Sequence, residues 1–461
     1  MTSQQRLVLA IAILASSVAF LDGSVITVAL PAISRELGGG LTTQQWVVDA
    51  YLVTLGALIL VAGSLSDVYG RIVVIRWGLW GFGLASVLCA IAPTAEFLIV
   101  CRGIQGIAGA LLVPSSLAII MSAFRGAAQA KAIGSWTAWT SAAFIAGPVV
   151  GGVFVDLLSW RLVFAINILP IALTLFLLMK LEHRDAREPG ATVDYVGAVL
   201  AIIGVGAPVF SLIEQGNYGW GSPVIWLPMA VGMLAFVAFL WRQATAKQPM
   251  MPLALFRVRN FAAGNLATLF IYAALSMSGF LIVVFLQQTG GYAATVAGVA
   301  ALPVTVILML LSSYFGGLSG KYGPRLFMTV GPILAGLGHL LMLTVTEPVN
   351  YWLQLLPGIL LFGLGLSITV APLTAAILGS ISERQSGIGS AINNAVARVA
   401  GLVAIAMLGI IVASKLDLDG MHRGLLVCAA LLIVGGAISA VGIRNPAAVP
   451  GETAGIVQPD Q

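Results

Sequence analysis

Long apolar segments recur along the whole chain, and they constrain its fold more than any other feature. Fourteen segments of about 18 residues or more carry few or no charges. A helix of about 20 residues crosses a hydrocarbon core that is about 30 Å thick. Strands of a membrane barrel would alternate apolar and polar side chains, and these segments do not. The sequence therefore predicts an all-α membrane protein, in line with a charged fraction of only 8%.

The fourteen expected helices also indicate how the chain is oriented. They cover residues 7–31, 44–64, 72–93, 97–122, 131–155, 162–180, 193–213, 224–241, 261–288, 294–317, 326–345, 351–379, 391–413 and 422–443. An even number of spans places both termini on one side, and sixteen of the 22 Lys and Arg residues fall there, against four on the other. Because basic loops mark the cytoplasmic side, we expect both termini in the cytoplasm and the chain in the cell membrane.

An internal repeat divides the chain. GSLSDVYGRIVVIRWG (63–78) and GGLSGKYGPRLFMTVG (316–331) share Gly, Leu-Ser, Tyr-Gly and a final Gly, and each follows an even-numbered span. Their separation exceeds what six helices with loops require, and duplicated halves are typical of transporters. We expect two six-helix halves at 1–185 and 251–445, with an inserted two-helix hairpin between them at 186–250. A disordered cytoplasmic tail follows at 446–461.

The first copy of the repeat resembles the loop motif of the major facilitator superfamily. The matching positions are Gly63, Leu65, Asp67, Gly70 and Arg71. Val68 and Ile72 stand where that motif usually has basic residues. Glycines suit a tight turn and close helix approach, and an Asp–Arg network here could latch two helices in one state of a switching cycle. An ordinary loop that sets the topology is the alternative.

Two further spans carry matches to the same superfamily. LIVCRGIQGIAGA (98–110) resembles its fourth-helix motif through Arg102, Gln105 and Gly106. An arginine within a span normally faces a partner or a wet cavity, although it can also be structural and reach toward the interface. AFIAGPVVGG resembles the fifth-helix motif of the exporter branch, with a bend at proline and close packing at small residues. Its matching positions are Gly147, Pro148, Gly151 and Gly152.

The segment FLDGSVITVALP (20–31) resembles the first-helix motif of the drug:proton antiporter group. The matching positions are Leu21, Asp22, Ala29, Leu30 and Pro31. With fourteen spans, the resemblance is to the fourteen-helix branch and covers essentially the whole chain. It implies a major-facilitator-type bundle of two six-helix halves plus a two-helix central insertion. ISERQSGIGSAINNAVARVAG (381–401) looks like the second-half counterpart and adds Arg398.

Asp22 is the residue that this resemblance makes most informative. If the first helix ends at Pro31, Asp22 lies about 14 Å from its outer end, where an ionised carboxylate is costly. The fold implied by the resemblance would place it near Arg102 across a cavity. We interpret Asp22 as an acid that a proton and the substrate share in turn; a structural Asp–Arg pair is the alternative. Asp49 is a second acid, either for proton or substrate contact or merely at an interface.

The resemblance implies a proton-coupled antiporter that exports amphipathic compounds, some of them cationic, such as drugs or other toxic molecules. The alternatives are a narrow exporter of one metabolite or self-made antibiotic, an importer, and a non-transporting sensor or enzyme. The sequence has no histidine pair, Cys/His spacing, nucleophile elbow or phosphate loop, so no enzyme activity, catalytic residue, metal or cofactor is expected. The expected partners are a small-molecule substrate, protons and lipid, with no nucleic acid, and the chain is expected to be a monomer.

Overall fold

The computed structural model describes residues 1–182, 192–382, 385–413 and 415–445. The expected tail at 446–461 and the expected boundary between 185 and 186 fall outside these ranges, as does Arg384 of the second-half motif. In the described residues, fourteen helices are long and apolar enough to cross a membrane. This confirms the predicted number of spans and the all-α class.

The helices fall into two groups and a hairpin. The first group comprises α1 (Ser3–Leu37), α2 (Gly40–Tyr69), α3 (Arg71–Ala90), α4 (Ala95–Ala123), α5 (Gly126–Leu157), α6 (Leu162–Ala165) and α7 (Ile168–Met179). The hairpin is α8 (Tyr195–Tyr218) with α9 (Pro223–Thr245). The second group comprises η1 (Leu253–Arg257), α10 (Arg259–Gln288), α11 (Ala294–Ala300), α12 (Leu302–Tyr322), α13 (Pro324–Leu341), η2 (Met342–Thr344), η3 (Tyr351–Leu355), α14 (Leu356–Leu378), α15 (Ser386–Ile411) and α16 (Leu418–Gly442).

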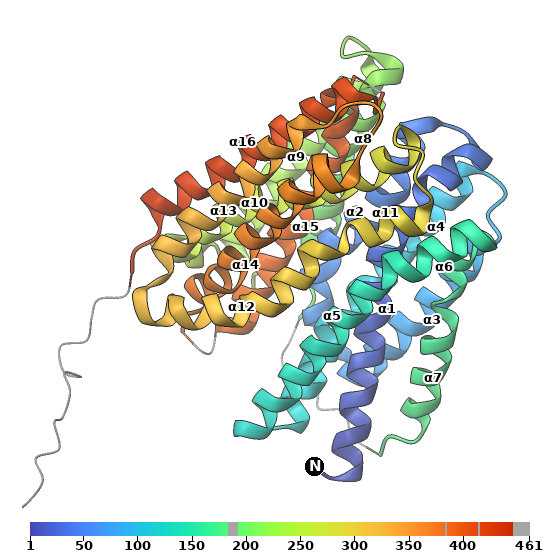
Figure 1. Ribbon diagram of the computed structural model, residues 1–461. Coiled ribbons are helices and arrows are strands. Elements are labelled where there is room, and N and C mark those ends of the chain that lie inside the picture. The colour runs from blue at the N-terminus through green and yellow to red at the C-terminus, as the bar shows by residue number, and fades with distance from the viewer. Residues whose placement is uncertain (183–191, 383–384, 414, 446–461) are drawn as a thin grey trace, which may run out of the picture.

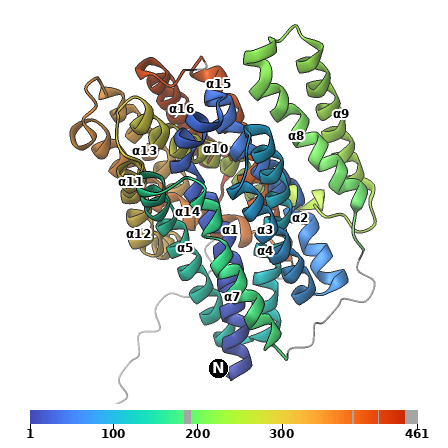
Figure 2. The ribbon, with the colours of Figure 1, turned by 90° about the vertical axis from the view of Figure 1, so that its right-hand side faces the viewer.

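Each group forms its own bundle. In the first group α1 packs on α4 and α5, while α4 also packs on α2 and α3. In the second group α10 packs on α15 and α16, and α13 packs on α14 and α16 (Figure 1). The hairpin stands at one side of the molecule, where α8 contacts both α2 and α15 (Figure 2). The hairpin therefore touches both groups.

Hydrogen bonds between the two groups lie toward the face opposite the N-terminus. They join Gln45 Nε2 to the carbonyl oxygen of Ile405 (2.6 Å), Gln287 Nε2 to that of Val28 (3.2 Å), and the Asp156 carboxylate to the backbone N–H groups of Ala294 (2.9 Å) and Thr295 (2.8 Å). Toward the face that carries the N-terminus, α5 and α12 diverge (Figure 1). The two groups thus meet most closely at one face of the bundle.

The first helix is longer than the sequence predicted. Pro31 lies inside α1, which continues to Leu37 and stops at Gly38, whose φ of 83° favours glycine. The expectation that the helix ends at Pro31 was wrong, because membrane helices tolerate proline where neighbouring helices and polar side chains compensate for the lost bond. Asp22 therefore lies about 22 Å from the end of the helix, near its middle.

The loop motif joins α2 to α3 through Gly70. Asp67 lies in the last turn of α2 and Arg71 begins α3, while Gly70 between them has a φ of 101°. Gly323 links α12 to α13 in the same way, with a φ of 85°. A backbone with such a φ favours glycine. Gly63 differs, since a Cβ there would meet no heavy atom within 4 Å, so close helix approach does not explain it.

Candidate functional site

Asp22 lies in the interior of the first group, on α1, with 1% of its surface exposed. Its Oδ2 accepts a hydrogen bond from Arg102 Nη1 at 2.6 Å. Its Oδ1 accepts from Gln105 Nε2 and from Asn167 Nδ2, each at 2.9 Å. Three donors from two other parts of the chain therefore converge on one carboxylate.

Arg102 is fully buried on α4 and is held on several sides. Its Nε donates to the carbonyl oxygen of Val47 at 2.9 Å, and its Nη1 also donates to Gln105 Oε1 at 2.7 Å. The ring of Tyr51 lies against the guanidinium, with 4.4 Å between Cζ and the ring centroid. Such an aromatic contact adds to the electrostatic stabilisation of a desolvated cation.

Asn167 and Ser86 complete the network, and sequence reasoning assigned neither a role. Asn167 lies at the break between α6 and α7, inside the span expected at 162–180. Ser86 on α3 accepts from Gln105 Nε2 at 3.0 Å and from Asn167 Nδ2 at 3.4 Å. The available signal was an amide within an apolar span, which usually has a hydrogen-bonding partner on another helix.

The pairing of Asp22 with Arg102 agrees with the proposal made from the sequence, but its surroundings do not. The two side chains were expected to face each other across a cavity, whereas they are in direct contact and almost wholly enclosed. Burying two charges is unfavourable unless the remaining donors and acceptors are also satisfied. Here the additional hydrogen bonds from the two amides supply this satisfaction.

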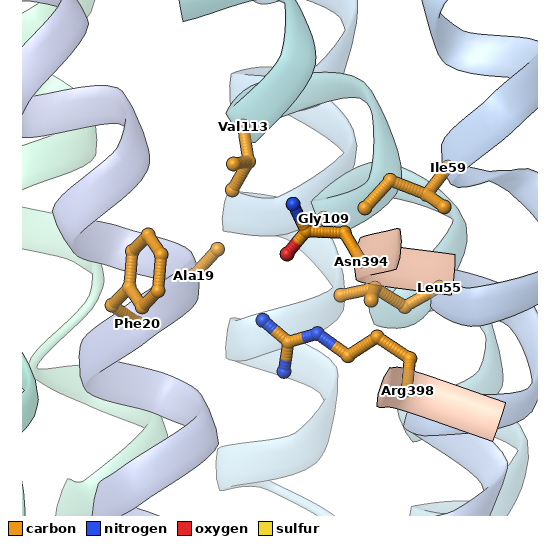
Figure 3. Close-up of a pocket in the computed structure, with 8 residues that line it drawn as sticks. All are labelled: Ala19, Phe20, Leu55, Ile59, Gly109, Val113, Asn394 and Arg398. Atoms are coloured by element: carbon orange, nitrogen blue, oxygen red, sulfur yellow. The ribbon is translucent and has the colours of Figure 1, made fainter. Parts of the chain in front are cut away.

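A small pocket lies between the two groups, close to this ion pair. It is lined by Ala19, Phe20, Leu55, Ile59, Gly109, Val113, Asn394 and Arg398 (Figure 3). Its cavity volume is about 20 Å³, which is space for about one water molecule. Arg398, which the sequence named as a site residue, therefore lies at the pocket and not in the ion pair.

Tyr51 lies beside both the ion pair and one residue of the pocket lining. Arg102, Gln105, Gly109 and Val113 follow one another on one face of α4, so the pocket continues directly from the ion pair along that helix. The ring of Tyr51 covers Arg102, and a Cβ at Gly109 would lie 3.0 Å from the Tyr51 hydroxyl. That hydroxyl is buried and has no hydrogen-bond partner in the described part of the chain. One aromatic side chain thus contacts both the ion pair and a residue that lines the pocket.

Asp49 lies elsewhere, where α2 faces α15. The residues one turn before and one turn after it, Gln45 and Val53, both pack on α15. Asp49 is 0% exposed, and neither of its carboxyl oxygens has a hydrogen-bond partner among the described residues. An ionised carboxyl without a partner is costly in such a place. The structure therefore brings Asp49 to the contact between the two groups and away from Asp22.

The glycines of the fifth-helix motif form a packing seam. A Cβ at Gly147 would meet Ser24 of α1, and one at Gly151 would lie 2.5 Å from Val25 Cγ2. A Cβ at Gly152 would meet the backbone of Thr295, at the start of α11. α5 therefore packs closely on α1 within its own group and on α11 of the other group.

No metal site is found in the described residues, since nowhere do three His, Cys, Asp or Glu side chains gather as ligands. The three cysteines are free and buried. Fourteen candidate membrane spans in two helix groups, with a buried ion pair and a small pocket between the groups, fit a membrane transporter. The family model of the Major Facilitator Superfamily matches residues 12–405, so the chain belongs to that superfamily, which is one of transporters and not of enzymes.

The relatives of the chain include resistance and multidrug proteins. It is 33% identical over 398 residues to the methylenomycin A resistance protein of Bacillus subtilis (strain 168). The aligned region covers 86% of this chain and 84% of that protein. It is 34% identical over 406 residues to the multidrug resistance protein Stp of Mycobacterium tuberculosis (strain CDC 1551 / Oshkosh), covering 86% and 74% respectively. The chain is thus related to drug and antibiotic efflux proteins.

Solved structures agree with the fold. A peptide transporter POT in complex with sulfate superposes with a TM-score of 0.70 at 14% identity, over 95% of this chain and 94% of that one. A D-xylose–proton symporter gives a TM-score of 0.69 at 14% identity, over 96% and 99%. These likenesses confirm the major-facilitator fold.

The buried ion pair predicts strong coupling between its two residues. We expect Asp22→Asn and Arg102→Gln each to destabilise the folded protein by about 3 kcal/mol, because each leaves a buried group without its charge partner. The double variant should lose less than the sum of the two single effects. The measurement is thermal unfolding of the purified full chain in detergent. Strictly additive effects would contradict the pairing.

Proposed function

We propose that this protein is a proton-coupled antiporter that exports small molecules, including drugs or other toxic compounds, across the cell membrane. The observation that carries the proposal is the buried Asp22–Arg102 pair, a carboxylate at the middle of a spanning helix beside a pocket. Related proteins named for resistance and multidrug transport support export as the direction. The division into parts at 1–185, 186–250 and 251–445 belongs to the same proposal.

The excess of Lys and Arg on the side of the termini supports a cytoplasmic position for both. The face at which the two groups meet is then the outer one, and the face at which α5 and α12 diverge is the inner one (Figure 1). This conformation is the one in which substrate enters from the cytoplasm. The loop motif around Gly70, with Asp67 and Arg71, then lies at the inner face and acts as a latch in the opposite conformation.

Proton binding at Asp22 would act through α1. A proton on the carboxylate removes its charge and weakens the hold of Arg102. Ser24 and Val25, on the following turn of α1, pack against the glycine seam of α5. A small shift of α1 at Asp22 is therefore transmitted to the contact that closes the outer face, in keeping with the bistable packing of such interfaces.

The position of Tyr51 against Arg102 sets a condition on this mechanism. Substrate in the pocket can act on the ion pair only when the Tyr51 ring moves away from Arg102. Asp49 is the second candidate for the coupling acid, because it is buried without partners at the contact between α2 and α15. Movement of the two groups would change its surroundings directly.

A narrow range of substrates is the alternative within the same function. Several relatives are named for one compound, among them the tetracenomycin C resistance and export protein of Streptomyces glaucescens, which is 30% identical over 399 residues. A panel of antibiotics tested in an efflux-deficient host, with a proton uncoupler as control, separates broad from narrow export.

Replacing the coupling acid should abolish exchange even in the protein that remains folded at its lower stability. In energised everted vesicles, addition of methylenomycin A, a compound for which a relative is named, should release protons with the wild type and not with Asp22→Asn. Asp419→Asn, an exposed acid at the start of α16, is the matched control and should behave as the wild type. Unchanged proton release with Asp22→Asn, or its loss only with Asp49→Asn, would contradict Asp22 as the coupling acid.

The glycine seam should control closure of the outer face. Gly152→Ala places a Cβ against the Thr295 backbone, so we expect the outer face to open more often and transport to fall several-fold. Gly134→Ala on the same helix has no heavy atom within 4 Å of the new Cβ and should have no effect. The readout is labelling of Phe20→Cys by an impermeant maleimide added from outside. Equal labelling in both glycine variants would refute the role of the seam.

A further inference from the structure

The pocket between the two groups has a one-sided polar lining. Of its eight lining residues, six are apolar or glycine and come from α1, α2 and α4. The other two, Asn394 and Arg398, come from α15 of the second group. Both side chains point from α15 toward Ala19 and Phe20 on α1 (Figure 3). The first group thus offers an apolar surface, and the second offers hydrogen-bond donors.

Arg398 has no charge partner in the described part of the chain. The three ion pairs found there involve Arg102, Arg161 and Arg242. Arg398 is only partly buried, and its backbone is close to α2, since a Cβ at Gly56 would lie 3.4 Å from Arg398 Cβ. An arginine inside a membrane span normally pairs with another group or faces a wet cavity. The unpaired guanidinium therefore points to an acidic group brought by a ligand.

Among the described residues, no acidic side chain lines the pocket. Asp22 is enclosed with Arg102 beside Tyr51, and Asp49 is buried where α2 faces α15. The Tyr51 hydroxyl, next to Gly109 in the pocket wall, is a further donor without a partner among the described residues. A lipophilic cation would meet like charge from Arg398 and no carboxylate to offset it.

We propose that the pocket selects compounds that carry a carboxylate or a similar anionic group, with Arg398 as the specificity-determining residue. The planar guanidinium donates two parallel hydrogen bonds to a carboxylate, Asn394 donates a third, and the apolar wall of Ala19, Phe20 and Leu55 receives the rest of the ligand. The cavity must widen to admit such a ligand, which requires the two groups to move apart. This assignment rests on the proposed export function and replaces the expectation of cationic substrates.

A pair of dyes that differ in one carboxyl group tests the assignment. Rhodamine B carries a free carboxylate, and its ethyl ester does not. Binding of each to the full chain in lipid nanodiscs is measured by fluorescence anisotropy. We expect the acid to bind about tenfold more tightly than the ester, Arg398→Gln to abolish the difference, and Arg398→Lys to keep part of it. Arg423→Gln, which removes an arginine remote from the pocket on α16, should leave the preference unchanged.

Binding of the ester as tightly as the acid would overturn the assignment, as would failure of the acid to bind or an equal loss of both dyes in Arg398→Gln. Thermal unfolding of each variant shows whether it is folded. Dye uptake into energised everted vesicles separates this inference from the function on which it rests. Uptake of the ester without any dependence on Arg398 would leave export standing and refute the anionic site. An Arg398-dependent preference in binding, without uptake of either dye, would leave the site standing and count against export.

Discussion

The buried ion pair of Asp22 and Arg102 is the interaction on which the first group of helices depends. It joins α1 to α4, and its surrounding hydrogen bonds reach α3 and the break between α6 and α7. Two buried charges are stable only when their other donors and acceptors are satisfied, and the amides of Gln105 and Asn167 meet that condition. A change of charge at Asp22 would therefore disturb every helix that contributes to the network.

Close packing by small residues can convert a change of charge at Asp22 into a relative movement of the two helix groups. α5 lies against α1 and α11 through glycines that leave no room for a Cβ, so the seam between the groups has few intermediate arrangements. Interfaces of this kind switch between packings more readily than they deform. The proton site and the closing seam share α1, which explains how a local charge could select a global conformation. Asp22 lies between them along α1: Ala19 and Phe20 line the pocket before it, and Ser24 and Val25 meet the seam after it.

The sequence predicted the number of spans, because membrane helices need long apolar segments and such segments are easy to recognise in this chain. It also singled out Asp22, Arg102 and Gln105, since polar side chains in such segments are costly and require partners. Asn167 could have been noticed as an amide within an apolar span, but its partner could not, because that depends on how the break between α6 and α7 is oriented against α1. Ser86 was beyond reach for the same reason, since a serine on α3 gives no distinct signal. The predicted end of α1 at Pro31 was wrong, since proline ends helices in water more reliably than in a packed membrane bundle.

The central claim is that Asp22 gains and loses a proton as the protein works, and infrared difference spectroscopy tests it most directly. The full chain in lipid is stepped between acidic and neutral pH, and the absorbance of protonated carboxyl groups is followed. The account predicts a carboxyl band that appears in the wild type and in Asp49→Asn but is missing from Asp22→Asn. A band that survives in Asp22→Asn and disappears in Asp49→Asn would contradict it, and the Asp22–Arg102 pair would then be a structural element only.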